Sequence, residues 1–176
     1  EWIVEPQDGV VDGEVFVDGS RLYAEHDLYG LCARQGWAFT VYDEQQKIVA
    51  AAKGRTPQWA EGIHVTELYG LLTAASLATP QSTFKIDCLA VRQGARSGAK
   101  WAAAPSRRLG RAWCPLSAAL DEGTEKVEWM PAHCTEKDIG VKLIGDGSLL
   151  TAHHIAGNDS VDVNAKSVAR RERPPP

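Results

Sequence analysis

The chain has 176 residues, of which 44% are hydrophobic and 24% are charged. This composition is typical of one globular domain and excludes a disordered or collagen-like chain, and no apolar run approaches the roughly 20 residues of a membrane span, so we expect a soluble protein. The formal net charge of −4 argues against a simple basic coat for nucleic acid.

Five segments rich in β-forming residues and bounded by turn signals predict strands. They are residues 14–18, 36–42, 47–51, 83–87 and 126–130. A polar turn, Asp43-Glu44-Gln45-Gln46, joins the second and third, and residues 14–51 together predict an antiparallel meander. Further along the chain, Gly145-Asp146-Gly147 lies between the apolar segments 141–144 and 148–151 and predicts a β-hairpin.

Helical periodicity appears in three regions between and after these strands. Apolar residues recur at helical spacing over residues 65–75, and Pro80 ends that helix. Residues 89–121 predict two short helices with a protruding loop. A last helix is expected to start near Asn158 as its N-cap. The element order predicts an α/β fold, in which a five-stranded mixed sheet carries helices on its faces.

The segment from Cys88 to Leu120 is basic, although the chain as a whole is acidic. It holds six cations and no acid, against 13 cations and 23 acids in the remainder. This asymmetry suggests that the acids hold metal and that the basic segment holds phosphates. The alternative is an ordinary solvated helical surface.

Four acids stand out by their positions in the predicted elements. Asp18 closes the first strand and Asp87 the fourth, while Glu67 lies in the first long helix and Asp162 one turn into the last. Two carboxylates at neighbouring strand ends repel each other, and a hard divalent cation such as Mg²⁺ relieves that conflict. Two such ions can support phosphodiester cleavage. Taken singly, each acid also fits a helix cap, a turn residue or a surface charge.

Five motifs in the same order resemble those of the type 1 ribonuclease H family, within the ribonuclease H-like superfamily. The resemblance covers residues 14–169. The motifs are Val15-Phe-Val-Asp-Gly-Ser20, Thr66-Glu-Leu-Tyr-Gly-Leu-Leu-Thr-Ala74, Phe84-Lys-Ile-Asp-Cys88, Val127-Glu-Trp-Met-Pro-Ala-His133 and Gly157-Asn-Asp-Ser-Val-Asp-Val-Asn-Ala-Lys166.

The resemblance implies a ribonuclease H-like fold and a specific reaction. The four acids Asp18, Glu67, Asp87 and Asp162 are expected to hold two Mg²⁺ or Mn²⁺ ions, and His133 to assist product release or proton handling. The implied activity is hydrolysis of the RNA strand of an RNA·DNA hybrid, leaving 5′-phosphate and 3′-hydroxyl ends.

The same resemblance implies a set of substrate contacts. We expect the residues near the acids and those of a basic arm, residues 92–111, to touch the hybrid. They are Gly19, Ser20, His64, Asn158, Arg96, Lys100, Arg107, Arg108 and Arg111.

The sequence departs from the family pattern in two places. His133 and Asp162 are separated by 28 residues, which is longer than usual; the extra segment, residues 135–156, is an insert carrying the predicted hairpin. The family's T-N-[NQ] before the glutamate helix is replaced by Gly62-Ile63-His64-Val65. Those amides would read 2′-hydroxyls in the minor groove, so the choice between RNA and DNA stays open.

Other interpretations stay open beside this one. A related DNA nuclease or transposase core would use the same acids, and a degenerate domain of a larger polymerase would only bind nucleic acid. A zinc site from His133, Cys134, His153 and His154 matches no common spacing, and the four cysteines are too dispersed for a disulfide framework.

We divide the chain into an N-terminal extension (1–13), a ribonuclease H-like domain (14–170) and a C-terminal tail (171–176). We expect no membrane association and an intracellular location, nuclear or cytoplasmic. The domain is expected to be monomeric or part of a larger polyprotein, such as that of a retrotransposon.

Overall fold

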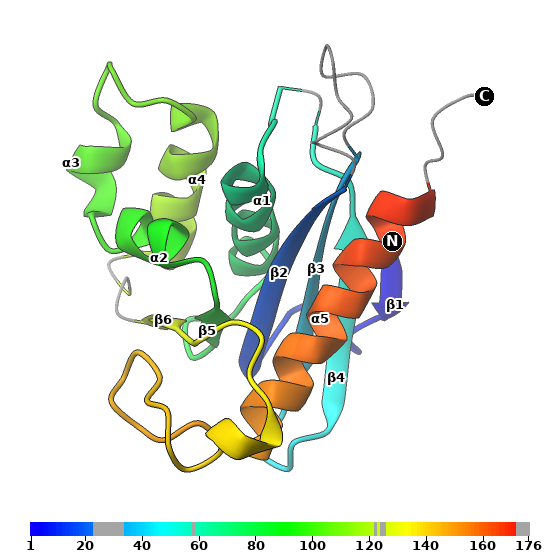
Figure 1. Cartoon of the computed structure of the whole chain (residues 1–176). Helices are drawn as coiled ribbons and strands as arrows, with labels where there is room; N and C mark the ends of the chain where they lie inside the picture. Colours follow the sequence, from blue (N-terminus) through cyan, green and yellow to red (C-terminus); the bar gives the residue numbers. More distant parts are fainter. Residues whose placement is uncertain (23–33, 58, 122, 124–125, 172–176) are drawn as a thin grey trace.

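The structure is a computed structural model, and it describes residues 1–22, 34–57, 59–121, 123 and 126–171. Their core is one six-stranded mixed sheet in the order β1-β4-β3-β2-β5-β6, with helices on both faces (Figure 1). The strands are β1 (Trp2–Val4), β2 (Glu14–Leu22), β3 (Arg34–Tyr42), β4 (Ile48–Gly54), β5 (Thr83–Ile86) and β6 (Val127–Trp129).

The expected mixed α/β sheet is confirmed. Strands β2, β3 and β4 form the antiparallel meander, β5 joins β2 in parallel, and β6 joins β5 in parallel. A short turn connects β3 to β4, whereas the parallel half requires the crossovers that carry the helices. The central strand β2 therefore has an antiparallel neighbour on one side and a parallel neighbour on the other.

The sheet has six strands where the sequence predicted five. The additional strand, β1, lies in the expected N-terminal extension and pairs antiparallel with β4, with Trp2 opposite Ala52. The Trp2 ring packs edge-on against Phe39, with the ring centroids 5.9 Å apart. Three residues are too few to show a period of two, so local pattern gives no signal for this strand. The expected domain boundaries at residues 14 and 170 stay predictions.

Strand β2 is also longer than predicted. The sequence Asp18-Gly19-Ser20 was expected to end it in a turn, but the pairing with β3 continues to Leu22 opposite Arg34. Asp18 consequently lies within the strand rather than at its end. Long-range pairing overrides the local turn preference here.

Two long helices cover opposite faces of the sheet (Figure 1). Helix α1 (Ile63–Ala75) packs on the face that carries Val15 and Val17, and α5 (Ala152–Arg171) packs on the face that carries Phe16. This alternation along β2 follows from the period of two in a strand. None of the helices in the described ranges has the length and apolar character of a membrane span.

Three short helices form a separate lobe beside α1, where the sequence predicted two helices and a loop. They are α2 (Leu89–Ala95), α3 (Gly98–Ala102) and α4 (Gly110–Leu120). Trp113 of α4 is buried and contacts Trp101 of α3 edge-on, with centroids 5.1 Å apart. This lobe contains the basic arm, which is anchored because Trp113 belongs to the hydrophobic core cluster and Trp101 packs against that cluster.

Helix α5 begins at Ala152, six residues before the expected start. The start is fixed by Thr151 and His154, which cap each other: the His154 amide donates to Thr151 Oγ1 at 3.3 Å, and the Thr151 amide donates to His154 Nδ1 at 3.1 Å. This is the capping-box geometry with histidine in the place of Glu or Gln. Asn158 is therefore an interior helical residue and not an N-cap.

The insert contains a smaller hairpin than predicted. Only one antiparallel bridge forms, between Leu143 and Leu149, although backbone hydrogen bonds close the turn between them. The last five residues of the insert belong to α5, and a short 3₁₀ helix, η3 (Glu136–Asp138), begins it. The buried side chains of Ile144 and Leu150 fix the turn against the core.

A buried lysine ties the insert to the sheet at the end of β2 remote from Asp18. Lys85 of β5 pairs with Glu128, lies 3.6 Å from Glu14 and lies 3.9 Å from Asp146 in the insert. A buried cation is tolerated only where acids compensate its charge, so this network fixes the insert turn to β2, β5 and β6.

The predicted C-terminal tail is described only at its first residue. Arg171 pairs with Glu1 at 2.9 Å, and residues 172–176 lie outside the described residues.

Candidate active site

The point where β2 and β5 separate places two of the acids side by side. The parallel pairing of these strands ends with Val17 opposite Ile86, and the next residue on each strand is an acid, Asp18 and Asp87. Trp129 of β6 donates through Nε1 to the Asp87 carbonyl at 3.0 Å, which holds the start of the β5–α2 connection. Ligand and catalytic sites in mixed sheets form where neighbouring strands diverge in this way.

The third acid, Glu67, reaches the same point from α1. The helix passes directly over Gly19, where a Cβ would lie only 2.6 Å from the Glu67 amide nitrogen. Further along α1, a Cβ on Gly70 would lie 3.0 Å from Val17 and 3.2 Å from Trp37. Two glycines, one on each element, therefore allow α1 to lie close enough to β2 for Glu67 to join Asp18.

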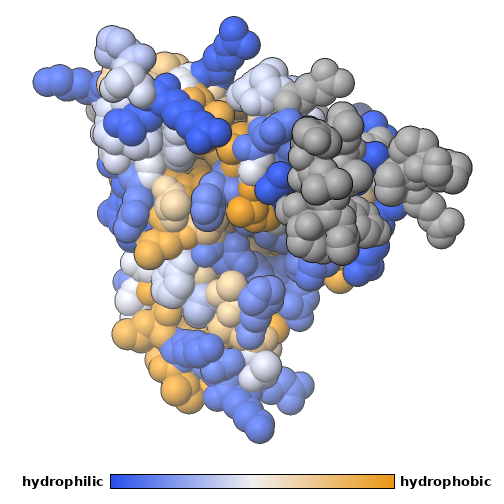
Figure 2. Space-filling model, turned by 45° about the horizontal axis from the view of Figure 1, so that its top comes forward, coloured by the Kyte–Doolittle hydropathy of each residue, from blue (hydrophilic) through white to orange (hydrophobic). Residues whose placement is uncertain are grey.

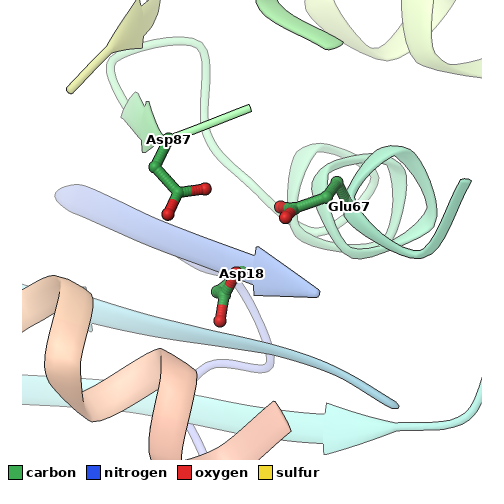
Figure 3. Close-up of side chains that lie close together, drawn as sticks. All are labelled: Asp18, Glu67 and Asp87. Atoms are coloured by element: carbon green, nitrogen blue, oxygen red, sulfur yellow. The ribbon is translucent and has the colours of Figure 1, made fainter. Parts of the chain in front are cut away.

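Asp18, Glu67 and Asp87, the acidic trio, each place one carboxylate oxygen within 4.8 Å of the others. Figure 3 shows the three side chains arriving from β2, α1 and the end of β5, with Asp87 and Glu67 pointing toward each other. Asp18 and Glu67 are only 5% and 6% exposed. Three like charges held this close out of water cannot all ionise freely.

The acidic trio consequently has a strong affinity for protons. Burial, with the charges of Asp87 and Asp162, raises the pKa of Asp18 to about 7. Burial, followed by the charges of Asp18 and Asp87, raises the pKa of Glu67 well above its ordinary value. Burial is also the main reason why the pKa of Asp87 is raised, and the nearby His133 opposes that change.

The donor set fits a hard divalent cation. The Glu67 Oε2 atom is buried and has no hydrogen-bond partner among the residues that the structure describes, which is costly unless something else satisfies it. The trio offers carboxylate oxygens only, the ligands that Mg²⁺ and Mn²⁺ prefer. A bound cation would satisfy this oxygen and relieve the mutual repulsion of the trio.

The fourth predicted acid, Asp162, does not belong to the close cluster. It lies near the middle of α5, rather than one turn into it, and accepts a 2.7 Å hydrogen bond from Lys166. It still faces the same region, because its charge contributes to raising the pKa of Asp18 and of Asp87. Lys166 is not among the predicted site residues, although its spacing of four residues from Asp162 is the signal for a helical ion pair.

His133 lies at the mouth of the site. It is exposed on the loop after β6, in a left-handed conformation with φ of 50°. Its charge lowers the pKa of Asp87 against the effect of burial, so the ring is close to that carboxylate. This position leaves it accessible to solvent.

The predicted substrate contacts near the acids differ in exposure. Gly19 and Ser20 lie on β2 directly after Asp18, and both are buried. His64 is exposed in the first turn of α1, with Nδ1 3.3 Å from the Cys88 sulfur. Asn158 is buried on α5, outside the acidic trio.

In the basic arm, four of the five cations predicted to bind substrate are exposed: Arg96, Lys100, Arg108 and Arg111. Figure 2 shows hydrophilic side chains projecting from the left part of the molecule, where the lobe of α2–α4 lies in Figure 1. Arg107 differs, because its guanidinium stacks 3.7 Å from the Trp101 ring centroid and Nε donates to the Trp101 carbonyl at 3.3 Å. Arg107 therefore stabilises the arm itself.

The residues of the zinc alternative serve other contacts. His153 bonds to Glu14 at 2.7 Å and His154 caps α5, while Cys134 contacts the Pro131 carbonyl and Lys142. Within the described ranges, the acidic trio is the grouping of potential metal ligands that comes together.

The sheet order, the two flanking helices and the acidic trio at the strand divergence define a ribonuclease H-like fold. Solved structures agree. The PFV RNase H domain is similar with a TM-score of 0.61 and 12% identity, covering 93% of this chain and 98% of that domain. RNase H1 from the halophilic archaeon Halobacterium salinarum NRC-1 is similar with a TM-score of 0.51 and 11% identity, covering 92% and 99%.

A third similar structure belongs to a much longer protein. The foamy viral protease-reverse transcriptase in complex with RNA/DNA hybrid matches with a TM-score of 0.58 and 11% identity over 90% of this chain, which corresponds to 20% of that protein. No protein-family model matches the sequence, and no curated protein matches it significantly. At these identities the likeness is one of fold, and it confirms the fold that the motifs predicted.

Proposed function

We propose that this chain is a metal-dependent endonuclease that hydrolyses the RNA strand of RNA·DNA hybrids. The observation that carries the proposal is the acidic trio, whose carboxylates share one site in which Glu67 Oε2 is buried and has no hydrogen-bond partner within the described ranges. A charge cluster of this kind destabilises the empty protein, so its presence at the strand divergence is best explained by a cationic ligand.

Asp18, Glu67 and Asp87 would hold Mg²⁺ or Mn²⁺, with Asp162 as the fourth ligand of a two-ion site. When bound, two such ions supply an activated water and stabilise the leaving oxygen of a phosphodiester. The buried position of Asp18 and Glu67 limits access of bulk water, which strengthens every charge interaction in the site.

Residues of the chain itself supply the remaining roles. His133 stands near Asp87 at the solvent edge, where it would assist product release or proton handling. The exposed cations Arg96, Lys100, Arg108 and Arg111 would contact phosphates of the DNA strand. Gly19, Ser20, His64 and Asn158 stay predicted contacts of the hybrid.

The similar proteins support the choice of substrate. Two are named RNase H, and the third was solved with an RNA/DNA hybrid as part of a protease-reverse transcriptase. We therefore also propose that this domain acts within a larger polyprotein. The departure at Gly62–Val65 makes a DNA nuclease the competing assignment.

A cleavage assay tests the proposal. Labelled RNA·DNA hybrid, RNA duplex and DNA duplex are incubated with the chain, with Mg²⁺ or with EDTA, beside the variant Asp87→Asn. We expect cleavage of the RNA strand of the hybrid only, dependent on Mg²⁺ and lost in the variant. Cleavage of DNA duplex would favour the DNA nuclease, and tight hybrid binding without cleavage would indicate a degenerate binding domain.

A further inference from the structure

The side chain of Gln35 joins β3 to the start of α1. Its Oε1 atom accepts a hydrogen bond from the Gly62 amide at 2.9 Å and another from the Thr66 hydroxyl at 2.8 Å. Gln35 is half-buried at the second residue of β3, opposite Arg21 of β2. One side-chain oxygen thus holds two groups that are four residues apart on the helix.

Helix α1 lacks the local residues that usually fix a helix start. Its N-cap is Gly62, which has φ of 116° and no side chain to offer, and its first turn contains no acid. The third helical residue is Val65, which has no oxygen to accept from the Gly62 amide as Glu or Gln does in a capping box. Gln35 makes this hydrogen bond from a different element, 27 residues earlier in the chain.

Thr66, which donates a hydrogen bond to Gln35, directly precedes Glu67 in α1. Thr66 is completely buried, and its hydroxyl also lies 3.1 Å from the Gly62 carbonyl, so it is shared between the helix start and Gln35. The following residue, Glu67, has its backbone pressed against Gly19 of β2. The glutamate is therefore fixed from two strands, by close packing on β2 and by hydrogen bonds to β3.

We infer that Gln35 is a positioning residue for the proposed reaction, which holds Glu67 against Asp18 and Asp87 through Thr66 and the Gly62 amide. The inference rests on the proposed function. Clustered carboxylates repel one another, so α1 tends to move away from β2 and β5 unless it is held. Groups that orient metal ligands typically change metal affinity or activity by about 10–100-fold when they are removed.

The test compares Gln35→Ala with Gln35→Glu, which keeps an acceptor oxygen at the same reach, and with the control Gln45→Ala in an exposed turn. The Gly62 amide and the Thr66 hydroxyl both need an acceptor at position 35, and a glutamate side chain supplies one. We expect Gln35→Ala to lower kcat for hybrid cleavage about tenfold and to weaken Mn²⁺ binding in calorimetry similarly, with KM changed less than about twofold. Gln35→Glu and Gln45→Ala are expected to stay within about twofold of the wild type.

A second variant keeps the inference falsifiable if Gln35→Ala folds poorly. Thr66→Val preserves the shape of the buried side chain and removes only the hydroxyl, and its loss in kcat should not add to that of Gln35→Ala, because both act through one contact. A lowered Tm in Gln35→Ala with unchanged kcat and Mn²⁺ affinity would overturn the inference. Equal losses of kcat in Gln35→Ala and Gln35→Glu would also overturn it.

The readouts separate this inference from the proposed function. If the wild type cleaves no nucleic acid, the proposed function fails, and Gln35 is judged on Mn²⁺ affinity alone. Weaker binding in Gln35→Ala, restored in Gln35→Glu, would then still support a positioning role, and unchanged binding would refute it.

Discussion

Lys166 donates to the carboxylate of Asp162 at 2.7 Å, one turn further along α5. The fourth acid therefore has a counter-charge on its own helix, whereas the three acids of the acidic trio face one another. In the proposed two-ion site, Lys166 competes with the metal for Asp162. The ion pair is about one-third exposed, so the competition is weak.

We expect Lys166→Met to lower the Mg²⁺ concentration that gives half-maximal cleavage by about twofold, since a helical pair of this kind is worth only about 0.3–0.5 kcal/mol. A Mg²⁺ titration of the cleavage rate measures this. Lys142→Met is the matched control, because Lys142 pairs with Asp138 at the same spacing in the insert. A higher Mg²⁺ requirement in Lys166→Met would show that the lysine supports the site.

Asp87→Asn should abolish hybrid cleavage and stabilise the metal-free protein. The substitution keeps the shape of the side chain but removes one of three crowded charges, so metal-free protein is expected to gain on the order of 1 kcal/mol in free energy of unfolding. Thermal denaturation in EDTA measures the gain, and hybrid cleavage should be lost in the same variant. With saturating Mg²⁺ the free energy of unfolding of the wild type should rise to that of the variant. A variant less stable than the wild type in EDTA would contradict the charge repulsion that we assign to the acidic trio.

The stability of the metal-free protein should fall as the pH rises. The pKa of Asp18 is about 7 in the folded protein and 3.8 ordinarily, so between these values the folded state binds more protons than the unfolded state. Stability is therefore greatest below about pH 4 with respect to this group and decreases until about pH 7. The raised pKa values of Glu67 and Asp87 act in the same direction.

Between pH 5 and pH 8 we expect a loss of about 1–3 kcal/mol in EDTA, measured by denaturant unfolding. Mg²⁺ should reduce this loss, because it binds the deprotonated carboxylates and its affinity rises with pH. The variant Asp18→Asn should flatten the dependence. A wild-type stability that rises over this range in EDTA would place the trio's carboxylates farther apart than the structure does.

Much of the site follows from local sequence, and the remainder depends on contacts between distant segments. Asp87 directly follows an apolar strand and Glu67 lies on a periodic helix, so local pattern located both. Asp18 is predicted as a site residue because its Asp-Gly-Ser context indicates a strand end; the pairing with β3 shows instead that β2 continues to Leu22. Local propensity competes with such long-range pairing and often loses.

Other features had no usable local signal. β1 is three residues long and exists because β4 offers a free edge. The start of α5 uses a histidine where a capping box usually has Glu or Gln, so the pattern at Thr151 was missed. The hydrogen bonds of Gln35 join residues 27 and 31 positions apart, a separation that no periodicity reveals.

The basic arm should bind substrate through its exposed cations rather than through Arg107. Arg108→Ala with Arg111→Ala, placed in the inactive Asp87→Asn protein, should weaken hybrid binding in fluorescence anisotropy. The slope of log affinity against log salt should become shallower by about 0.7–0.9 for each lost phosphate contact.

Arg107→Ala is expected to behave differently, because the Arg107 guanidinium stacks on the Trp101 ring and donates to the Trp101 carbonyl. Losing the cation–π contact should cost about 0.5–1 kcal/mol in free energy of unfolding, with a smaller change in the salt slope. Lys47→Ala, in the exposed turn between β3 and β4, controls for loss of charge alone. If all three variants reduced affinity and salt slope equally, binding would follow net charge and the arm would have no specific role.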